Sequence, residues 1–217
     1  MKRLVILISG RGSNMTAILD AVRDGKIAGE VTSIISSRPE AAGLAIASNR
    51  GIATTAIDHR AYPDRATFEH ALMEAIDAHA PDLIVLAGFM RILSGEFVDR
   101  YAGRMMNIHP SLLPSYPGLD THSRALADGV RIHGCTVHFV TDDVDHGPIV
   151  AQAAVPVRGD DDAKALAARV LEAEHRMLVA AVGWFCAGRL VIDGARVRVK
   201  NEGGDLAPLI VPPPDLS

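Results

Sequence analysis

Short apolar segments alternate with amphipathic segments from the N-terminus onward, and this alternation leaves few folds open to the chain. The apolar segments have the length of buried strands and lie at 3–9, 30–36, 53–57, 83–87 and 105–109. The segments between them space their apolar residues as helices do, at 14–24, 39–49, 64–79 and 94–101. Strands that alternate with helices build a mostly parallel, twisted sheet with helices on both faces. We therefore predict a single α/β domain of the Rossmann-like type over residues 1–200.

The pattern changes after residue 110, where a loop rich in proline and glycine replaces the next helix. Strands at 133–140 and 149–157 lie so close in sequence that antiparallel pairing is easier than a parallel crossover. We therefore expect one antiparallel strand in the C-terminal half. The other expected elements are helices at 121–128 and 160–187, a hairpin at 189–199 around Asp193-Gly194, and an extended tail at 201–217.

Charge and composition exclude some classes of partner. The net charge is −4 over 217 residues, and no basic block is present, which argues against nucleic acid. No segment approaches the roughly 20 apolar residues of a membrane span, and the first apolar run is too short for a signal peptide. Cys135 and Cys186 lie far apart, as reduced core thiols do, and no metal-ligand spacing is present. We expect a cytoplasmic monomer or homodimer that binds small molecules and no metal.

The run M-M-N-I-H-P carries the strongest chemical signal of the chain. Asn107 and His109 end a predicted strand two residues apart, so their side chains leave the same face of the sheet. Pro110 removes a backbone donor and keeps His109 extended. Open α/β sheets bind their ligands at such strand ends. The alternative is a solvated histidine at a polar strand end, and the pairing with an amide disfavours it.

The run S-G-R-G-S-N, residues 9–14, joins the first strand to the first helix. Glycines such as Gly12 allow close approach of a ligand, and the free N–H groups of a helix start attract an anion. Ser13 and Asn14 can add side-chain donors. The turn therefore predicts a phosphate site, and a plain turn with Ser13 as the helix cap is the alternative.

The same turn does not match a dinucleotide site. The dinucleotide fingerprint needs a third glycine where Met15 stands, and no acidic residue ends the second strand to hold a ribose. A phosphate monoester therefore fits better than NAD. Ser37 and Arg38 at the end of the second strand keep NADP open as a weaker alternative.

The run T-D-D-V-D-H-G-P-I holds three aspartates between the two later strands. An aspartate beside an imidazole orients the ring and stabilises its cationic form, so one of the three could serve His109. Sequence spacing does not choose among Asp142, Asp143 and Asp145. A solvated acidic turn is the alternative, because loop carboxylates are common.

Two further features have two interpretations each, and a third has one default expectation. The run G-F-M-R-I-L, residues 88–93, fits either a flat apolar ligand site with Arg91 as its one cation or a core-packing turn with a surface arginine. His138 could face the same cleft or be a buried structural histidine. Glu174 lies on the long predicted helix, where exposure to solvent is the default expectation.

Four of these motifs together resemble the folate-dependent phosphoribosylglycinamide formyltransferases of purine synthesis. They are S-G-R-G-S-N, L-A-G-F-M-R-I-L, N-I-H-P-S-L-L-P-S-Y-P-G and V-D-H-G-P-I. The resemblance implies the formyltransferase fold, with phosphate binding in the N-terminal half and the folate loop and long helix in the C-terminal half. It also implies transfer of the formyl group of 10-formyltetrahydrofolate to the amine of 5-phosphoribosylglycinamide. The implied products are N-formylglycinamide ribonucleotide and tetrahydrofolate, in the de novo synthesis of IMP.

The resemblance also implies roles for particular residues. It gives Asn107, His109 and Asp145 as the catalytic set, and so selects one of the three loop aspartates. The implied site for phosphoribosylglycinamide consists of Gly12, Ser13, Asn14 and Glu174. The implied folate site consists of Arg65, Met90, Arg91, Ile92, Leu93, Asn107, Thr141 and Asp145.

Two functions of other classes stay open on the sequence alone. One is an NADP-dependent reductase, against which the missing third glycine counts, and the other is a nucleotide-binding module without catalysis. Relatives that act on initiator tRNA need a basic extra domain, and formylfolate hydrolases usually carry an N-terminal regulatory domain. The sequence begins at its first strand and ends soon after the long helix, so we expect neither of these.

Overall fold

Five parallel strands form one half of the sheet in the computed structural model, which describes residues 1–201, 203 and 211. They are β1 (Lys2–Ile8), β2 (Gly29–Ser36), β3 (Thr54–Ala56), β4 (Leu83–Leu86) and β5 (Met105–His109). β1 pairs with β2 on one side and with β4 on the other, so the chain changes direction across the sheet at β1. Open α/β sheets bind ligands beside such a switch point, at the carboxyl ends of the strands.

The other half of the sheet is mixed. Its strands are β6 (Ile132–Phe139), β7 (Ile149–Pro156), β8 (Leu190–Asp193) and β9 (Arg196–Val199). In the described part of the chain the sheet has nine strands in the order β3-β2-β1-β4-β5-β6-β7-β9-β8. β6 is antiparallel to β5 and β7, which confirms the expected antiparallel strand. The predicted hairpin also forms, and it extends the sheet because β9 pairs with β7, an attachment that the sequence did not predict.

All six predicted helices are present, with ends that differ by a few residues. They are α1 (Ser13–Arg23), α2 (Ala42–Ser48), α3 (Arg65–Asp77), α4 (Gly95–Arg100), α5 (Thr121–Ala127) and α6 (Ala163–Cys186), together with the short 3₁₀ helix η1 (His59–Ala61). Asp64 and Asp162 cap α3 and α6, because their carboxylates accept hydrogen bonds from the first turn. α2 begins three residues later than predicted, because Ala41 N donates to Arg38 O in a turn.

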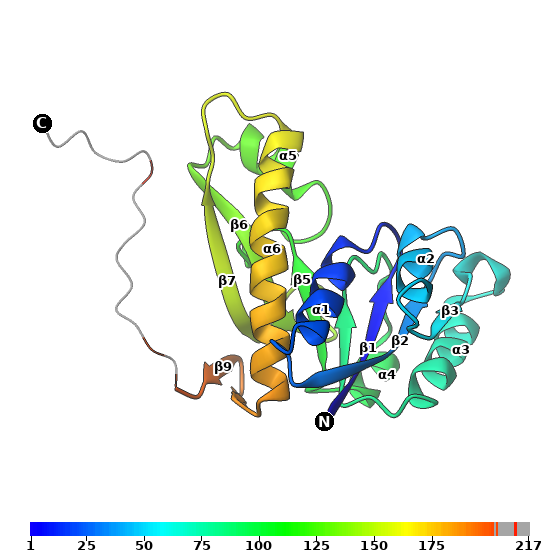
Figure 1. Ribbon diagram of the computed structural model, residues 1–217. Coiled ribbons are helices and arrows are strands. Elements are labelled where there is room, and N and C mark those ends of the chain that lie inside the picture. Colours follow the sequence, from blue (N-terminus) through cyan, green and yellow to red (C-terminus); the bar gives the residue numbers. More distant parts are fainter. Residues whose placement is uncertain (202, 204–210, 212–217) are drawn as a thin grey trace, which may run out of the picture.

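Alternate residues of β1 are buried in two separate layers. Leu4, Ile6 and Ile8 pack in the layer beneath α1 and α6, which lie side by side across one face of the sheet (Figure 1). Val5 and Leu7 pack in the layer beneath α3 and α4. All five side chains are fully buried, which explains why β1 reads as a continuous apolar run rather than as an alternating one.

A loop takes the place of a helix over one face of β6. Leu113 N donates to Thr136 Oγ1 at 3.0 Å, and Thr136 Oγ1 donates to Ser111 O at 2.7 Å. Gln152 Nε2 donates to Leu113 O at 2.8 Å, which ties the loop to β7 as well. These bonds hold the segment after His109 against the sheet, at the carboxyl end of β5.

Gly134 of β6 has no room for a side chain. A Cβ there would lie 1.9 Å from the backbone oxygen of Ala153 and 3.0 Å from Leu112 Cδ2. We expect Gly134→Ala to lower the free energy of unfolding by about 3 kcal/mol, measured by urea denaturation. Gly159→Ala is the control, since a Cβ at that glycine meets nothing within 4 Å. Equal unfolding midpoints for the two variants would contradict the prediction.

The last described strand ends at Val199, which supports 1–200 as the proposed extent of the domain. The tail expected at 201–217 lies outside the described residues, apart from 201, 203 and 211. Among the described residues, no helix combines the length and apolar character that crossing a bilayer requires.

Candidate active site

The loops that follow β1 and β4 meet beside the switch point of the sheet. Met90 N donates to Ser9 Oγ at 2.9 Å, and Ser9 N donates to Gly88 O at 3.1 Å. Ser9 Oγ also lies 2.7 Å from Ser37 Oγ at the end of β2. The predicted phosphate turn and the predicted apolar loop 88–93 are therefore joined by hydrogen bonds.

His109 ends β5 as a buried side chain with a partner on each ring nitrogen. Its Nε2 lies 2.9 Å from Tyr116 O, and its Nδ1 lies 3.4 Å from Asp145 Oδ2. A carbonyl only accepts hydrogen bonds, so Nε2 carries a proton. Nδ1 therefore faces the carboxylate of Asp145.

Asp145 reaches His109 through a tight return of the loop between β6 and β7. The residue has a φ of +58°, and its Oδ2 accepts a hydrogen bond from Gly118 N at 2.8 Å. Two residues later, a Cβ on Gly147 would lie 1.7 Å from Phe139 O, so the return requires glycine. The side chains of Asp142 and Asp143 are exposed. Of the three loop aspartates, Asp145 is the one beside the ring.

Asn107 lies on the same face as His109, as the strand pattern predicted. Its Nδ2 is 3.2 Å from Nε2 of His138, its cross-strand partner in the pairing of β5 with β6. The ring of His138 also lies 3.8 Å from Asp145 Oδ1. His138 is buried, with 2% of its surface exposed, and its ring is directed toward Asn107 and Asp145, so each of the two interpretations holds in part.

The phosphate turn leaves the first N–H groups of α1 without a side-chain acceptor. Gly12 is the N-cap with a φ of +76°, and no side chain caps the helix, so the alternative with Ser13 as cap is wrong. A Cβ at Gly12 would lie 3.0 Å from Gly43 Cα, so the turn needs glycine for space as well as for conformation. Unpaired N–H groups at a helix start form an anion site.

A dinucleotide does not fit this turn. Met15, at the position of the missing third glycine, is fully buried in the core. The hydroxyls that could hold an extra ribose phosphate are used within the protein. Ser36 Oγ donates to Arg38 O at 2.8 Å, and Ser37 Oγ bonds with Ser9 Oγ. The turn therefore favours a phosphate monoester.

Asn14 and Glu174 form a buried polar pair between α1 and α6. Asn14 Nδ2 donates to Glu174 Oε2 at 2.7 Å, while Asn14 Oδ1 is buried without a partner among the described residues. The default expectation of an exposed Glu174 is wrong, because the side chain is 8% exposed. Buried polar atoms are normally paired, so the free amide oxygen fits a ligand that brings a hydroxyl.

Burial raises the pKa of the Glu174 carboxyl, while the hydrogen bond from Asn14 opposes this shift. The folded state therefore keeps the proton to a higher pH than the unfolded chain does. As the pH rises through the raised pKa, the buried carboxyl becomes charged and the free energy of unfolding falls. We expect Glu174→Gln to raise the melting temperature at pH 8 by about 2–4 °C, an effect that shrinks toward pH 4. Scanning calorimetry checks this, and Glu172→Gln, an exposed change on the same helix, is expected to show no such gain. Equal melting temperatures for the Glu174 variant and the native chain at pH 8 would contradict it.

Apolar side chains are exposed on the loops around these polar groups. Met90 is 57% and Ile92 66% exposed on the loop after β4, and Val144 is 49% exposed on the loop that carries Asp145. Exposed apolar side chains beside convergent polar groups are typical of a site for a flat apolar ligand. Three polar residues were also predicted for the folate site. Arg91 donates to Met90 O, and Thr141 is exposed. Arg65 begins α3 as an exposed cation, with its Nε 3.8 Å from Glu69 Oε1.

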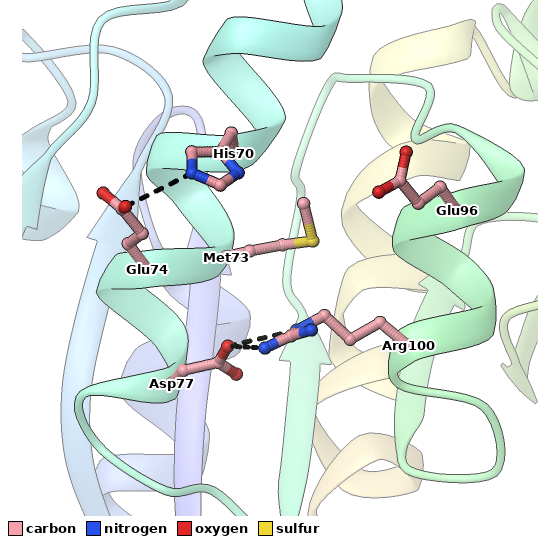
Figure 2. Close-up of a pocket in the computed structure, with 6 residues that line it drawn as sticks. All are labelled: His70, Met73, Glu74, Asp77, Glu96 and Arg100. Atoms are coloured by element: carbon pink, nitrogen blue, oxygen red, sulfur yellow. Dashed lines mark hydrogen bonds and ion pairs between the residues drawn. The ribbon is translucent and has the colours of Figure 1, made fainter.

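Of two surface grooves, one lies apart from these residues and the other includes Thr141 in its lining. A groove of about 210 Å³ runs between α3 and α4, where His70 pairs with Glu74 and Asp77 with Arg100 (Figure 2). None of the predicted site residues lines it. A second groove of about 380 Å³ adjoins the loop of Asp145 and is lined by Val98, Thr141, Asp142 and Ile192, among others. Among the described residues, no group of three or more His, Cys, Asp or Glu is arranged to hold a metal.

The structure also shows two contacts that sequence patterns did not reveal. Tyr116 O and Gly118 N, both backbone groups, bind His109 and Asp145. A pattern of side chains carries no signal for backbone partners, and the sequence indicated only a loop rich in proline and glycine at this place.

Comparison with known proteins places this chain in a family. The model of the formyl transferase family, described as "Formyl transferase", matches residues 2–182, so the chain belongs to that family. It is 50% identical to a phosphoribosylglycinamide formyltransferase of Escherichia coli, over 93% of this chain and 99% of that protein. A crystal structure of glycinamide ribonucleotide transformylase 1 from Symbiobacterium toebii matches with a TM-score of 0.90 and 48% identity, over 93% of this chain and 95% of that one.

Longer and more distant proteins share parts of this match. The chain is 44% identical to the trifunctional purine biosynthetic protein adenosine-3 of Bos taurus, of which it spans 19%, over 93% of its own length. A formyltetrahydrofolate deformylase from Pseudomonas syringae has the same fold at 24% identity and a TM-score of 0.86, over 92% of this chain and 66% of that one.

Proposed function

We propose that the chain is a phosphoribosylglycinamide formyltransferase, which transfers the formyl group of 10-formyltetrahydrofolate to the amine of 5-phosphoribosylglycinamide. The observation that carries the proposal is the convergence of Asn107, His109 and Asp145 at the carboxyl end of β5. An amide donor and a histidine–carboxylate pair are the groups that acyl transfer to an amine needs. The names of the close relatives support the same activity and its place in purine biosynthesis.

The two ligands would occupy neighbouring parts of the site. The N–H groups of Gly12 to Asn14 would bind the substrate phosphate, and the pair of Asn14 and Glu174 would bind ribose hydroxyls. The folate would lie against Met90, Arg91, Ile92 and Leu93 and against Thr141 and Asp145, with Arg65 near its carboxylates. The hydrogen bonds of Ser9 join the two loops, which would bring the amine to the formyl carbon.

The reaction follows from these positions. The neutral amine attacks the formyl carbon, a new C–N bond forms, and the carbonyl oxygen becomes an oxyanion. Asn107 donates a hydrogen bond to that oxygen, and the His109–Asp145 pair takes the proton that the amine loses. The bond to folate N10 then breaks, and N10 receives the proton, so no covalent enzyme intermediate is needed.

A spectroscopic assay tests the function directly. Mixing the protein with 10-formyl folate and phosphoribosylglycinamide should release deformylated folate, and it should do so only when both substrates are present. Folate release without the amine would indicate a hydrolase, and no release with both substrates would overturn the proposal.

A charge at Ser13 tests the phosphate turn. We expect Ser13→Asp to raise KM for phosphoribosylglycinamide by about tenfold or more, through repulsion between the carboxylate and the phosphate, with little change in KM for the folate. An acidic residue in the first turn of a helix is favourable, so the fold should persist. Ser13→Ala is the matched control, with a smaller effect. An unchanged KM for the phosphorylated substrate would remove this turn from the site.

A further inference from the structure

His138 is a buried histidine that the proposed reaction does not yet use. It lies on β6 directly opposite Asn107, with 2% of its surface exposed. Its Nδ1 is 3.0 Å from Phe139 O, and its Nε2 is 3.2 Å from Asn107 Nδ2. Both ring nitrogens are therefore committed to defined partners.

The partners determine which nitrogen carries the proton. Phe139 O is a carbonyl and can only accept, so Nδ1 must be the N–H nitrogen. In the neutral ring Nε2 then has a lone pair, and it accepts a hydrogen bond from the amide of Asn107. The opposite amide orientation would direct Asn107 Oδ1 at this lone pair, so the two acceptors would repel each other.

If both ring nitrogens carried a proton, Nε2 could no longer accept a hydrogen bond from Asn107. The surroundings of His138 disfavour this doubly protonated form. Burial lowers the pKa of His138, and the nearby His109 ring lowers it further, while Phe139 O and Asp145 raise it by a smaller amount. The Asp145 carboxylate, with Oδ1 3.8 Å from Nε2, and the His109 ring are the charged or titratable groups facing His138. The neutral ring with its proton on Nδ1 is therefore the form present near neutral pH.

We propose that His138 is a positioning residue that fixes the amide of Asn107, holding one N–H so that the other is directed at the formyl oxygen. This role rests on the proposed formyl transfer. The nitrogen and oxygen of an amide have nearly the same size, so packing alone hardly distinguishes the two orientations. The reversed amide would direct an oxygen at the developing oxyanion, where repulsion replaces a stabilising hydrogen bond.

A double-mutant cycle separates positioning from general damage to the site. We expect His138→Phe to lower kcat by about 10- to 100-fold, with KM for both substrates within about threefold. Because the effect acts through Asn107, the double variant of Asn107→Ala and His138→Phe should be no slower than Asn107→Ala alone. In contrast, losses in kcat/KM should multiply when His138→Phe is combined with Glu174→Gln. His70→Phe, an exposed change on α3, is the control for the substitution itself.

A measurement without catalysis tests the same inference. The ¹⁵N chemical shifts of the His138 ring in the native protein should show the proton on Nδ1 and an unprotonated Nε2 at about pH 8. A proton on Nε2 would overturn the proposal, even if His138→Phe failed to fold. Multiplying losses in the Asn107 cycle, or near-native turnover of His138→Phe, would also overturn it. Turnover by the native chain in the same assay tests the formyl transfer itself, so the two failures are distinguishable.

Discussion

Replacing His109 with alanine is expected to lower kcat by about 10³-fold, while KM for both substrates changes by less than about threefold. The ring ends β5 between Tyr116 O and Asp145, so it is oriented before any substrate binds. Its proposed task, taking the proton from the amine and passing it to folate N10, matters in the transition state rather than in binding. Steady-state kinetics with each substrate varied in turn measures the two effects separately.

Two comparisons sharpen this result. His70→Ala removes an exposed histidine that lines the groove between α3 and α4, and its turnover should stay near native. His109→Ala leaves Tyr116 O without its donor, so a melting curve must show that the variant is folded at the assay temperature. A folded His109 variant with near-native kcat would show that the ring has no part in the chemistry.

Asp145→Asn is expected to lower kcat by about 10²- to 10³-fold, with little loss of fold. Asparagine tolerates the left-handed backbone of this position, where φ is +58°, and its oxygen can still accept from Gly118 N. The substitution therefore removes the negative charge opposite His109 Nδ1 and changes little else. The kcat of the variant, measured in the same assay, reports what that charge contributes.

Asp143→Asn is the matched comparison, because it removes a charge from the same loop at an exposed side chain. We expect its kcat to stay within about threefold of native. Because His109 and Asp145 act as one unit, the double variant of His109→Ala and Asp145→Asn should be hardly slower than His109→Ala alone. Fully multiplying losses, or equal effects of the Asp143 and Asp145 changes, would contradict the pairing.

The sheet and its helices could be predicted because their signals are local. β1 is buried on both faces and reads as an apolar run, while Asp64 and Asp162 mark the starts of α3 and α6 as capping residues. The starts of α2 and α6 were each predicted three residues too early, and before α2 a turn satisfies the same backbone groups. The attachment of the hairpin β8–β9 to β7 was not predicted, because strand order is decided between distant segments.

The site was predicted only in part, because some of its signals are local and others join distant segments. The two-residue spacing placed Asn107 and His109 on one face, and the glycine turn marked the start of α1 as an anion site. Glu174 was expected at the surface, because one helix alone does not show that α1 will cover it and that Asn14 will donate to it. His138 had two interpretations, and the register of β5 with β6 shows that this buried ring lies beside Asn107.

The sequence by itself determined the alternation of strands and helices, the glycine turn, and the shared face of the amide and the imidazole. Periodicity, turn chemistry and capping act between residues a few positions apart, so they can be read from neighbours in the chain. Only the tertiary structure decided which backbone groups hold His109 and Asp145, and which nitrogen of His138 faces the amide. Those contacts join segments that are distant along the chain, and strand register and loop packing bring them together.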